Sequence, residues 1–299
     1  MNIGAVIVTY NRLEKLKKCL SSYEKQTLLP AFILIIDNHS TDGTSEYLDE
    51  WAETSAPFEK IIYHSDSNTG GAGGFTLGIK TALTYKPDWI WLADDDAYPT
   101  SNCLELMSAY YDSLTPKTQA GIASLCCKVV DNNGLSPLHR RRIQFSFWQC
   151  REIPLAPPDY EVKTNEISLF SFVGTLIRTD VIKKAGLPRS DYFICFDDSE
   201  YALRIGQYGK IICLSDAVIL HDSLENTITS YSWQNYYRFR NKLYTYGAHF
   251  KKRHCFTEFV KHLYMVARYY NTSASWKQLS YAIKDALAGR LGKNNRYLP

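Results

Sequence analysis

The sequence contains no hydrophobic run long enough to cross a membrane. Its apolar stretches, such as 32–36, are short, whereas a spanning helix needs about 20 consecutive apolar residues. The N-terminus also lacks the basic residues that open a secretory leader, and the apolar segment 3–8 runs directly into polar residues. We therefore expect neither a membrane-spanning helix nor a signal peptide.

The eight cysteines follow no recognisable pattern. No pair is spaced as C-x-x-C, and no spacing is typical of a zinc site, which predicts a reduced, cytoplasmic protein. With 45% hydrophobic and 22% charged residues, the composition excludes disorder for most of the chain. The length of 299 residues allows two domains of about 150 residues, or one large domain with an extension.

Charge is distributed unevenly along the chain. Residues 234–299 carry 13 basic side chains against two acidic ones, a net charge of +11, whereas the first 233 residues carry −8. Such asymmetry suggests two regions with different partners. We predict an α/β domain over 1–232 and a basic helical region over 233–299. Nucleic acid is not expected as a partner, because the first region is acidic and no nucleic-acid-binding motif is present.

Strand and helix signals alternate over the first 100 residues. Short apolar runs at 3–8, 32–36, 60–63 and 89–93 predict buried parallel strands with helices between them. In such sheets, ligands bind at the carboxyl ends of the strands. Because polar clusters follow each of these runs, we expect a site at that edge.

Three adjacent carboxylates, Asp94, Asp95 and Asp96, follow the fourth predicted strand. At the end of a buried strand they repel one another and resist desolvation unless a cation neutralises them. Hard oxygen ligands of this kind suit Mg²⁺ or Mn²⁺. The alternative interpretation is a solvated acidic loop that caps the following helix.

Later polar groups allow a functional and a structural interpretation. Asp197 and Asp198 stand at a predicted helix start, where a carboxylate can serve as a general base or simply favour the helix dipole. His221 follows an apolar run, where it can ligate a metal or lie at the surface. The glycine-rich segment 68–74 matches neither a dinucleotide fingerprint nor a Walker A motif. By itself it indicates a flexible loop before a helix over 75–84.

In combination and in order, these motifs resemble the inverting glycosyltransferases of family 2. The resemblance extends over about residues 3–241 and includes D-D-x-E-x-x-x-R at 197–204 and Y-Y-x-x-R-N at 236–241. Within that family, the segment 68–75 and the triple aspartate are most similar to bacterial galactofuranosyltransferases.

The resemblance implies a GT-A fold, which is a mixed, mostly parallel sheet flanked by helices with a Rossmann-like nucleotide-binding half. It also implies a nucleotide-sugar site made of Thr9, Arg12, Asp37, Asn68, Gly70, Gly71 and Asp95. Within it, Asp37 is expected at the uracil edge and Arg12 near the diphosphate. The implied metal ligands are Asp94, Asp96 and His221, which would hold Mn²⁺ or Mg²⁺. The implied catalytic base is Asp198.

The implied reaction is a metal-dependent single displacement that inverts the anomeric centre. It transfers galactofuranose from UDP-galactofuranose to a hydroxyl of a lipid-linked glycan acceptor in surface polysaccharide synthesis. One alternative is a rhamnosyl- or other hexosyltransferase that uses dTDP-rhamnose or another UDP-sugar. Another is a noncatalytic nucleotide-sugar-binding module, although a mere binder would not need the Asp197–Asp198 pair.

The basic tail predicts association with a surface. Two apolar stripes recur at helical spacing, the first at Phe256, Phe259, Leu263 and Ala267 and the second at Trp276, Leu279, Ile283 and Leu287. Such helices are expected to hold the protein on the anionic inner face of the cell membrane. The alternative is that the stripes pack on the catalytic domain or against a second copy in a homo-oligomer.

Overall fold

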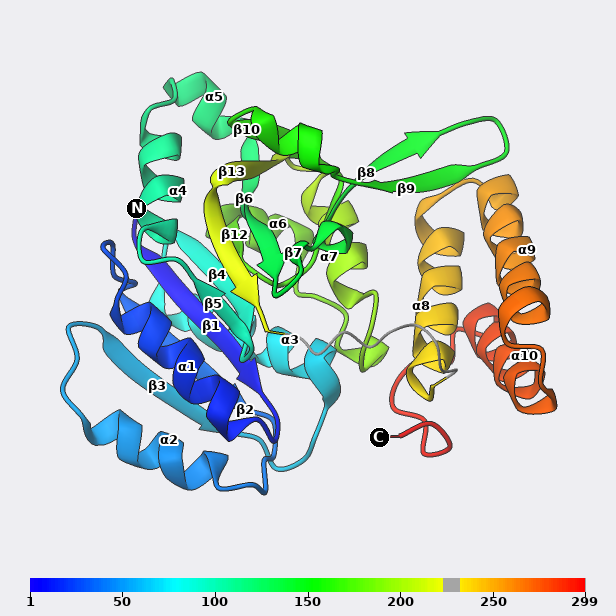
Figure 1. Cartoon of the computed structure of the whole chain (residues 1–299), viewed down its shortest axis with the longest axis horizontal. Coiled ribbons are helices and arrows are strands. Elements are labelled where there is room, and N and C mark those ends of the chain that lie inside the picture. Colours follow the sequence, from blue (N-terminus) through cyan, green and yellow to red (C-terminus); the bar gives the residue numbers. More distant parts are fainter. Residues whose placement is uncertain (223–231, 299) are drawn as a thin grey trace.

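A mixed β-sheet forms the centre of the computed structural model, which describes residues 1–222 and 232–298 (Figure 1). Within these residues the sheet has ten strands. Its continuous part runs in the order β3 (Glu59–His64), β2 (Phe32–Asp37), β1 (Ile3–Thr9), β4 (Trp89–Asp94), β12 (Thr175–Arg178), β6 (Ile122–Asp131), β13 (Lys210–His221) and β10 (Thr164–Ile167). The short strands β5 (Ala97–Pro99) and β7 (Gly134–Leu135) pair with β13 and β6.

Strand direction divides the sheet into two parts. The first four strands along the chain are mutually parallel and form a Rossmann-like half. β12 is antiparallel to both of its neighbours, while β6 and β13 are again parallel to each other. The predicted mixed, mostly parallel sheet is therefore confirmed.

Helices cover both faces of this sheet. One face packs against α1 (Leu13–Glu24), α2 (Thr44–Glu53) and α4 (Cys103–Asp112), and α5 (Pro116–Ala120) follows α4. The other face packs against α3 (Gly70–Ala82), α6 (Thr179–Ala185) and α7 (Asp197–Ile205). Alternate residues of β1 enter the two cores, with Ile7 on the first face and Val6 and Val8 on the second.

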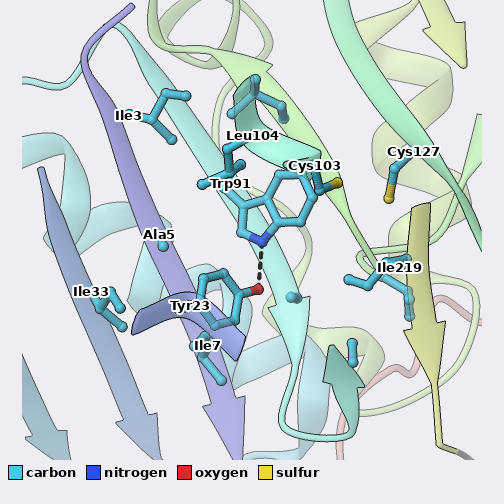
Figure 2. Close-up of a cluster of buried hydrophobic side chains, with 14 of the residues drawn as sticks. Ile3, Ala5, Ile7, Tyr23, Ile33, Trp91, Cys103, Leu104, Cys127 and Ile219 are labelled. Carbon is cyan, nitrogen blue, oxygen red and sulfur yellow. Dashed lines mark hydrogen bonds between the residues drawn. The ribbon is translucent and has the colours of Figure 1, made fainter. Parts of the chain in front are cut away.

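Trp91 of β4 lies at the centre of the first core (Figure 2). Its indole N–H donates a hydrogen bond to the hydroxyl of Tyr23 on α1 at 2.6 Å, and both side chains are fully buried. A buried indole needs such a partner, so this bond fixes α1 against β4. The end of β4, where the aspartates begin, is thereby held by the core.

The helix α3 begins at Gly70, so the prediction of a flexible glycine-rich loop before a helix at 75 is wrong. Its glycines allow close packing rather than flexibility. A Cβ on Gly74 would lie 2.5 Å from Val8 Cγ1 of β1. Gly70 has φ +74°, and a Cβ there would lie 2.0 Å from the carbonyl oxygen of Phe193. These glycines bring the helix N-terminus close to the edge where β1 ends.

A hairpin outside the main sheet extends toward the C-terminal helices (Figure 1). Its strands β8 (Arg140–Phe145) and β9 (Cys150–Pro154) form a second sheet with β11 (Leu169–Phe170). The base of the hairpin is fixed by Arg140, which is completely buried. Its guanidinium donates hydrogen bonds to the carbonyl oxygens of Cys127, Val173 and Gly174 at 2.6–3.0 Å.

The predicted C-terminal helical extension is present as α8 (Gln234–His249), α9 (Lys252–Tyr269) and α10 (Ser273–Leu287). Leu279 and Ala282 of α10 pack with aromatic residues of α8. In α9, however, the predicted apolar stripe is not the packed face, because Phe256 is 62% exposed. The residues buried along α9 are His254, Glu258, His262 and Val266.

Two remaining expectations concern the ends of these regions. The predicted boundary between residues 232 and 233 adjoins the segment 223–231, which, like Pro299, is outside the described residues, so it stays a prediction. Within the described part of the chain, no helix combines the length and the apolar character that a membrane span requires.

Candidate active site

The candidate site lies where β1 and β4 end. β1 is followed through α1 by β2, which pairs with one edge of β1, while β4 pairs with the other edge. The order in which strands are added to the sheet therefore reverses between β1 and β4. Ligands of open α/β sheets bind at such a switch point. A cavity of about 260 Å³ opens there. It is lined by six of the seven predicted nucleotide-binding residues: Thr9, Arg12, Asn68, Gly70, Gly71 and Asp95.

Asp95 is the member of the acidic triplet that contacts Thr9. It is buried and accepts hydrogen bonds from the Thr9 hydroxyl at 2.8 Å and from Arg12 Nη1 at 3.2 Å. Burial raises the pKa of Asp95 to about 6, although Arg12 opposes this. Burial and the charge of Asp96 raise the pKa of Asp94 to about 7. The triplet is therefore a site where positive charge is needed, not a solvated loop.

Asp96 and His221 form the other side of the acidic group. β13 pairs with β5, and this pairing brings His221 opposite Ala97 and its Nε2 within 3.2 Å of Asp96 Oδ1. Burial lowers the pKa of His221, but contact with Asp96 outweighs this effect, so the pKa is raised. Arg12 Nη1 lies 2.7 Å from the other oxygen of Asp96.

The structure brings the three predicted metal ligands together. One ligand atom from each of Asp94, Asp96 and His221 lies within 4.8 Å of the others. Two carboxylates and an imidazole are a suitable donor set for Mn²⁺ and, with added water ligands, for Mg²⁺. The buried, mutually repelling carboxylates fit a divalent cation.

Asp37 does not line the cavity. It ends β2, and its carboxylate accepts hydrogen bonds from the backbone of Ser40 at 2.9 Å and the hydroxyl of Ser45 at 2.5 Å. His64 Nδ1 lies 3.1 Å from the same carboxylate. Its contact with uracil stays a prediction.

Asn38 lines the cavity instead, and the sequence interpretation gave it no role. Its amide donates hydrogen bonds to the carbonyl oxygen of Gly70 at 3.0 Å and to Asn68 Oδ1 at 3.2 Å. Asn38 thus connects the end of β2 to the start of α3. Its position directly after Asp37 was the available signal, since adjacent residues at a strand end face the same edge.

The loop before α7 forms another wall of the cavity through Phe193 and Ile194. Phe193, Cys195 and Phe196 have φ of 65°, 68° and 71°, and non-glycine residues rarely adopt such left-handed conformations. The amide of Asn241 on α8 donates hydrogen bonds to the carbonyl oxygens of Tyr192, Ile194 and Cys195 at 2.8–3.0 Å. Asn241 therefore holds a strained loop in place, a role that the Y-Y-x-x-R-N motif alone did not reveal.

Asp197 and Asp198 begin α7 directly after this loop. Asp198 Oδ1 accepts hydrogen bonds from the backbone N–H of Ser199 at 2.5 Å and from its hydroxyl at 3.0 Å. Burial raises the pKa of Asp198, and Arg141 partly opposes this. Burial, the charge of Asp198 and, more weakly, that of Asp94 raise the pKa of Asp197. The charge of Asp94 therefore reaches Asp197, the residue before the predicted base.

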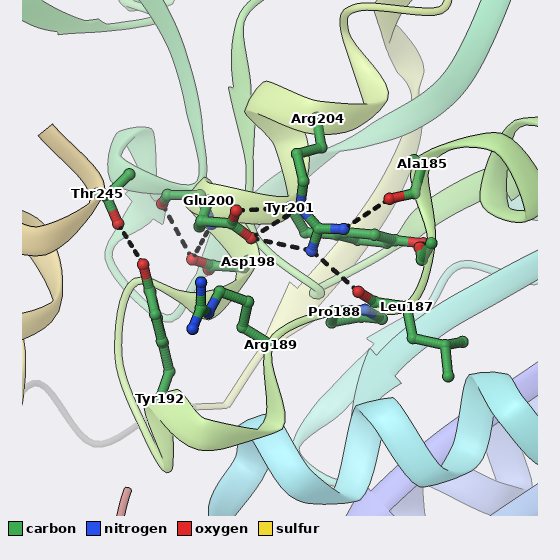
Figure 3. Close-up of polar contacts among 12 residues, drawn as sticks. Ala185, Leu187, Pro188, Arg189, Tyr192, Asp198, Glu200, Tyr201, Arg204 and Thr245 are labelled. Atoms are coloured by element: carbon green, nitrogen blue, oxygen red, sulfur yellow. Dashed lines mark hydrogen bonds and ion pairs between the residues drawn. The ribbon is translucent and has the colours of Figure 1, made fainter. Parts of the chain in front are cut away.

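An ion pair fixes α7 in this position (Figure 3). The guanidinium of Arg204 contacts both carboxylate oxygens of Glu200 at 2.9–3.1 Å. It also donates to the carbonyl oxygens of Ala185 at 2.8 Å and Leu187 at 3.0 Å. Arg204 thus ties α7 to the segment that precedes the strained loop.

Comparison with known sequences points to one enzyme family. The profile of glycosyl transferase family 2 matches residues 5–186. The galactofuranosyltransferase GlfT1 of Mycobacterium tuberculosis is 30% identical over 224 residues, which cover 74% of this chain and 70% of that protein. The dTDP-rhamnosyl transferase RfbF of Shigella flexneri is 23% identical over 232 residues, with 74% and 69% covered.

Solved structures share the fold. GalNAc-T7 with UDP, GalNAc and Mn²⁺ superposes with a TM-score of 0.64 at 16% identity, and the match covers 96% of this chain and 56% of that one. The first 349 residues of S. aureus TarS in complex with UDP-GlcNAc give 0.62 at 17% identity, with 96% and 81% covered. Together with the sheet order, these likenesses confirm the predicted GT-A fold.

Proposed function

The chain belongs to glycosyltransferase family 2, and from this premise we propose that it transfers galactofuranose from UDP-galactofuranose to a hydroxyl of a glycan acceptor. The observation that carries the proposal is the cavity at the switch point, which is lined by Asp94, one member of the Asp94–Asp96–His221 group. The similarity to GlfT1 over most of both chains supports the donor. A lipid-linked acceptor in surface polysaccharide synthesis completes the proposal.

In this proposal the diphosphate of the donor lies between Arg12 and the N-terminus of α3, where positive charge and helix dipole favour an anion. Asp94, Asp96 and His221 would hold Mn²⁺ or Mg²⁺, which would supply positive charge for the departing UDP. Gly71 leaves room there, because a Cβ on this residue would meet no atom within 4 Å. Thr9 orients Asp95 and thereby Arg12.

Asp198 acts as the general base in this mechanism. The acceptor oxygen attacks the anomeric carbon from the face opposite UDP, and its proton passes to the Asp198 carboxylate. The bond between the anomeric carbon and the UDP oxygen breaks as the new glycosidic bond forms, so the configuration inverts. The raised pKa of Asp198 improves its match to the proton that it must accept.

A screen of sugar nucleotides tests the donor. Purified protein is incubated with UDP-galactofuranose, other UDP-hexoses and dTDP-rhamnose, and transferred sugar or released nucleotide is detected by mass spectrometry. We expect turnover of UDP-galactofuranose. Turnover of dTDP-rhamnose alone would favour the second candidate function, a rhamnosyltransferase. The similarity to RfbF supports this candidate. Tight donor binding with no turnover of any kind would favour the binding module.

Loss of the histidine should weaken metal binding. His221→Ala removes one of three proposed ligands, although water can replace it at a hard cation. Even the loss of an outer partner of a metal ligand costs about 10–100-fold in affinity. We therefore expect the Mn²⁺ concentration for half-maximal activity to rise at least about tenfold. The measurement is activity against free Mn²⁺ after chelation.

His139 provides the matched control. Its ring lies 4.9 Å from that of His221, but it is not part of the metal-binding group. His139→Asn keeps all three proposed ligands, so it should raise the Mn²⁺ requirement less than His221→Ala does. Full activity of the unchanged enzyme after thorough chelation would remove the metal from the mechanism.

The described tail also supports peripheral attachment to the inner face of the membrane. An exposed surface, here called the aromatic edge, combines side chains of the β8–β9 hairpin and α9: Phe145, Phe147, Trp148, Phe256, Val260 and Tyr264. Thr257 donates to the carbonyl oxygen of Trp148 at 2.7 Å, which holds the hairpin turn beside α9. Lys251, Lys252 and Arg253 adjoin this surface in the chain. Exposed aromatics beside basic residues suit an anionic lipid surface.

Vesicle flotation tests this attachment. We expect binding to vesicles that contain phosphatidylglycerol, weaker binding as salt increases, and none to phosphatidylcholine alone. Trp148→Ser should reduce binding severalfold, because this indole is 61% exposed. Tyr63→Ser, at an exposed aromatic on β3, is the control. Binding to neither vesicle, with dimers in light scattering, would assign the aromatic edge to a second copy instead.

A further inference from the structure

A second cavity lies between β9, α8 and α9. Its volume is about 350 Å³, within the range of about 300–1,000 Å³ that small-molecule sites occupy. It shares no lining residue with the cavity at the switch point. Polar and apolar side chains both line it, among them Glu152, Phe239, Lys242, Glu258, His262 and Met265.

The polar wall of this cavity is a chain of charges. Lys242 Nζ lies 3.2 Å from Glu152 Oε1 and 3.0 Å from Glu258 Oε1. Tyr246 donates its hydroxyl proton to Glu152 at 2.9 Å. Both carboxylate side chains are largely buried, at 11% and 5% exposed. Each carboxylate has about four lone-pair positions, so these oxygens can accept further hydrogen bonds from hydroxyl groups.

His262 adds an unpaired hydrogen-bonding atom to the same wall. Its Nδ1 lies 2.8 Å from the carbonyl oxygen of Glu258, so this nitrogen carries the proton. The other nitrogen, Nε2, is buried and has no hydrogen-bond partner among the described residues. Burial lowers the pKa of His262, so the ring is neutral and Nε2 is an acceptor. A hydroxyl group can satisfy such an acceptor, whereas an anion without a proton to donate cannot.

The cavity is connected to Asp198 through side chains. Arg141 pairs with Glu152 and also donates to the hydroxyl of Ser199 at 2.6 Å. That hydroxyl donates to Asp198 at 3.0 Å. On α8, Gln234 lines the first cavity, and Arg238 and Lys242, each four residues further along, line the second. One helix face therefore runs from the cavity at the switch point to this cavity.

We propose that the second cavity binds a neutral sugar residue of the acceptor glycan, adjacent to the residue whose hydroxyl reacts. Glu152, Glu258 and His262 accept hydrogen bonds from its hydroxyls, and Phe239 and Met265 contact its apolar face. The inference rests on the proposed glycosyl transfer, since only an acceptor needs a site beside Asp198. It names the acceptor class as a neutral, hydroxyl-rich glycan.

The direct test follows the His262 ring by NMR in protein with labelled histidine. Methyl β-galactofuranoside, methyl β-galactopyranoside, lactose and inorganic phosphate are titrated in the presence of UDP. The His262 signal is identified by its absence in His262→Gln. We expect a saturable shift with at least one neutral glycoside and none with phosphate. A shift with phosphate alone, or with none of the four, would overturn the proposal.

This readout needs no turnover. A failed donor screen would refute the proposed function but would leave the NMR titration interpretable. If the donor screen succeeded and the NMR signal of His262 did not shift, only the second site would be refuted.

Two variants of His262 separate binding from folding. His262→Asn keeps a donor near the position of Nδ1 but removes Nε2, whereas His262→Gln keeps a polar atom near Nε2. Loss of one hydrogen bond from a buried site should raise the half-saturating glycoside concentration about tenfold in the first variant. The second should change it less. UDP affinity should match the wild type in both variants.

The matched control is His254, which is buried on the same face of α9 but does not line the cavity. Its Nε2 contacts the carbonyl oxygen of Ser146 at 3.2 Å, and its Nδ1 has no hydrogen-bond partner in the described part of the chain. His254→Gln should leave glycoside binding unchanged. Equal weakening by His254→Gln, or none by His262→Asn, would contradict the site.

Discussion

Replacing Asp198 with asparagine should lower the rate of transfer by about 10²–10⁴-fold and leave UDP affinity close to that of the wild type, since losing a general base typically costs this much. The amide has nearly the size of the carboxylate but cannot take the acceptor's proton. The amide oxygen of asparagine can still accept the hydrogen bonds from Ser199, so the substitution preserves this contact at the start of α7. Turnover and UDP affinity are measured on the same preparation, by product formation and by calorimetry.

The pH dependence of kcat provides the second readout for Asp198. The base must be unprotonated, so the rate falls as pH decreases through its pKa. Burial raises that pKa, and Arg141 partly opposes the rise. Arg141→Gln should therefore move the acidic limb of the profile to higher pH. A capping role alone would change the free energy of unfolding but not this limb, and near-wild-type turnover of Asp198→Asn would exclude the base.

Replacing Arg204 with methionine should lower the free energy of unfolding by about 3–5 kcal/mol, the usual cost of removing one partner from a buried ion pair. Glu200 would keep a buried charge with only His249 beside it, at 3.1 Å. The carbonyl oxygens of Ala185 and Leu187 would also lose their donor. Denaturant unfolding followed by tryptophan fluorescence measures the change.

Lys184→Met is the control for this substitution. Lys184 pairs with Asp180 at 3.5 Å on an exposed surface, where an ion pair contributes about 0–1 kcal/mol. The double substitution Glu200→Leu and Arg204→Met should recover part of the lost stability, because it removes the uncompensated charge. A single Arg204→Met variant as stable as the control would show that this pair is dispensable.

The Rossmann-like half and most of its site could be predicted because their signals are local. Short apolar runs give the strands, and Asp94 follows from a strand end alone, whereas Thr9 was assigned through the family resemblance. The start of α3 could not be predicted, since glycine disfavours helices. Only contact with Val8, 66 positions earlier, explains why Gly74 is helical. The glycine content of residues 68–74 therefore predicted the wrong local structure, while Asn68, Gly70 and Gly71 of this segment do line the cavity at the switch point.

The buried face of α9 could not be predicted for a related reason. Apolar periodicity pointed to the stripe that includes Phe256, for a membrane surface or alternatively for packing, whereas the face that is buried carries His254, Glu258 and His262. Glu258 is buried because Lys242 of α8 neutralises it at 3.0 Å, and that pairing cannot be read from the periodicity of α9. Sequence patterns assign polar residues to solvent unless their partner is known.

The hydrogen bonds from Asn241 to the loop before α7 affect when, during synthesis, the active site can form. Three carbonyl groups of the loop before Asp197 depend on one amide that the ribosome adds more than forty residues later. While the chain is still being synthesised, the nucleotide half can fold, but this loop has no partner to offset its strain. The proposed base therefore reaches its final place only after α8 has docked, so a nascent or truncated chain can form the sheet without a complete active site.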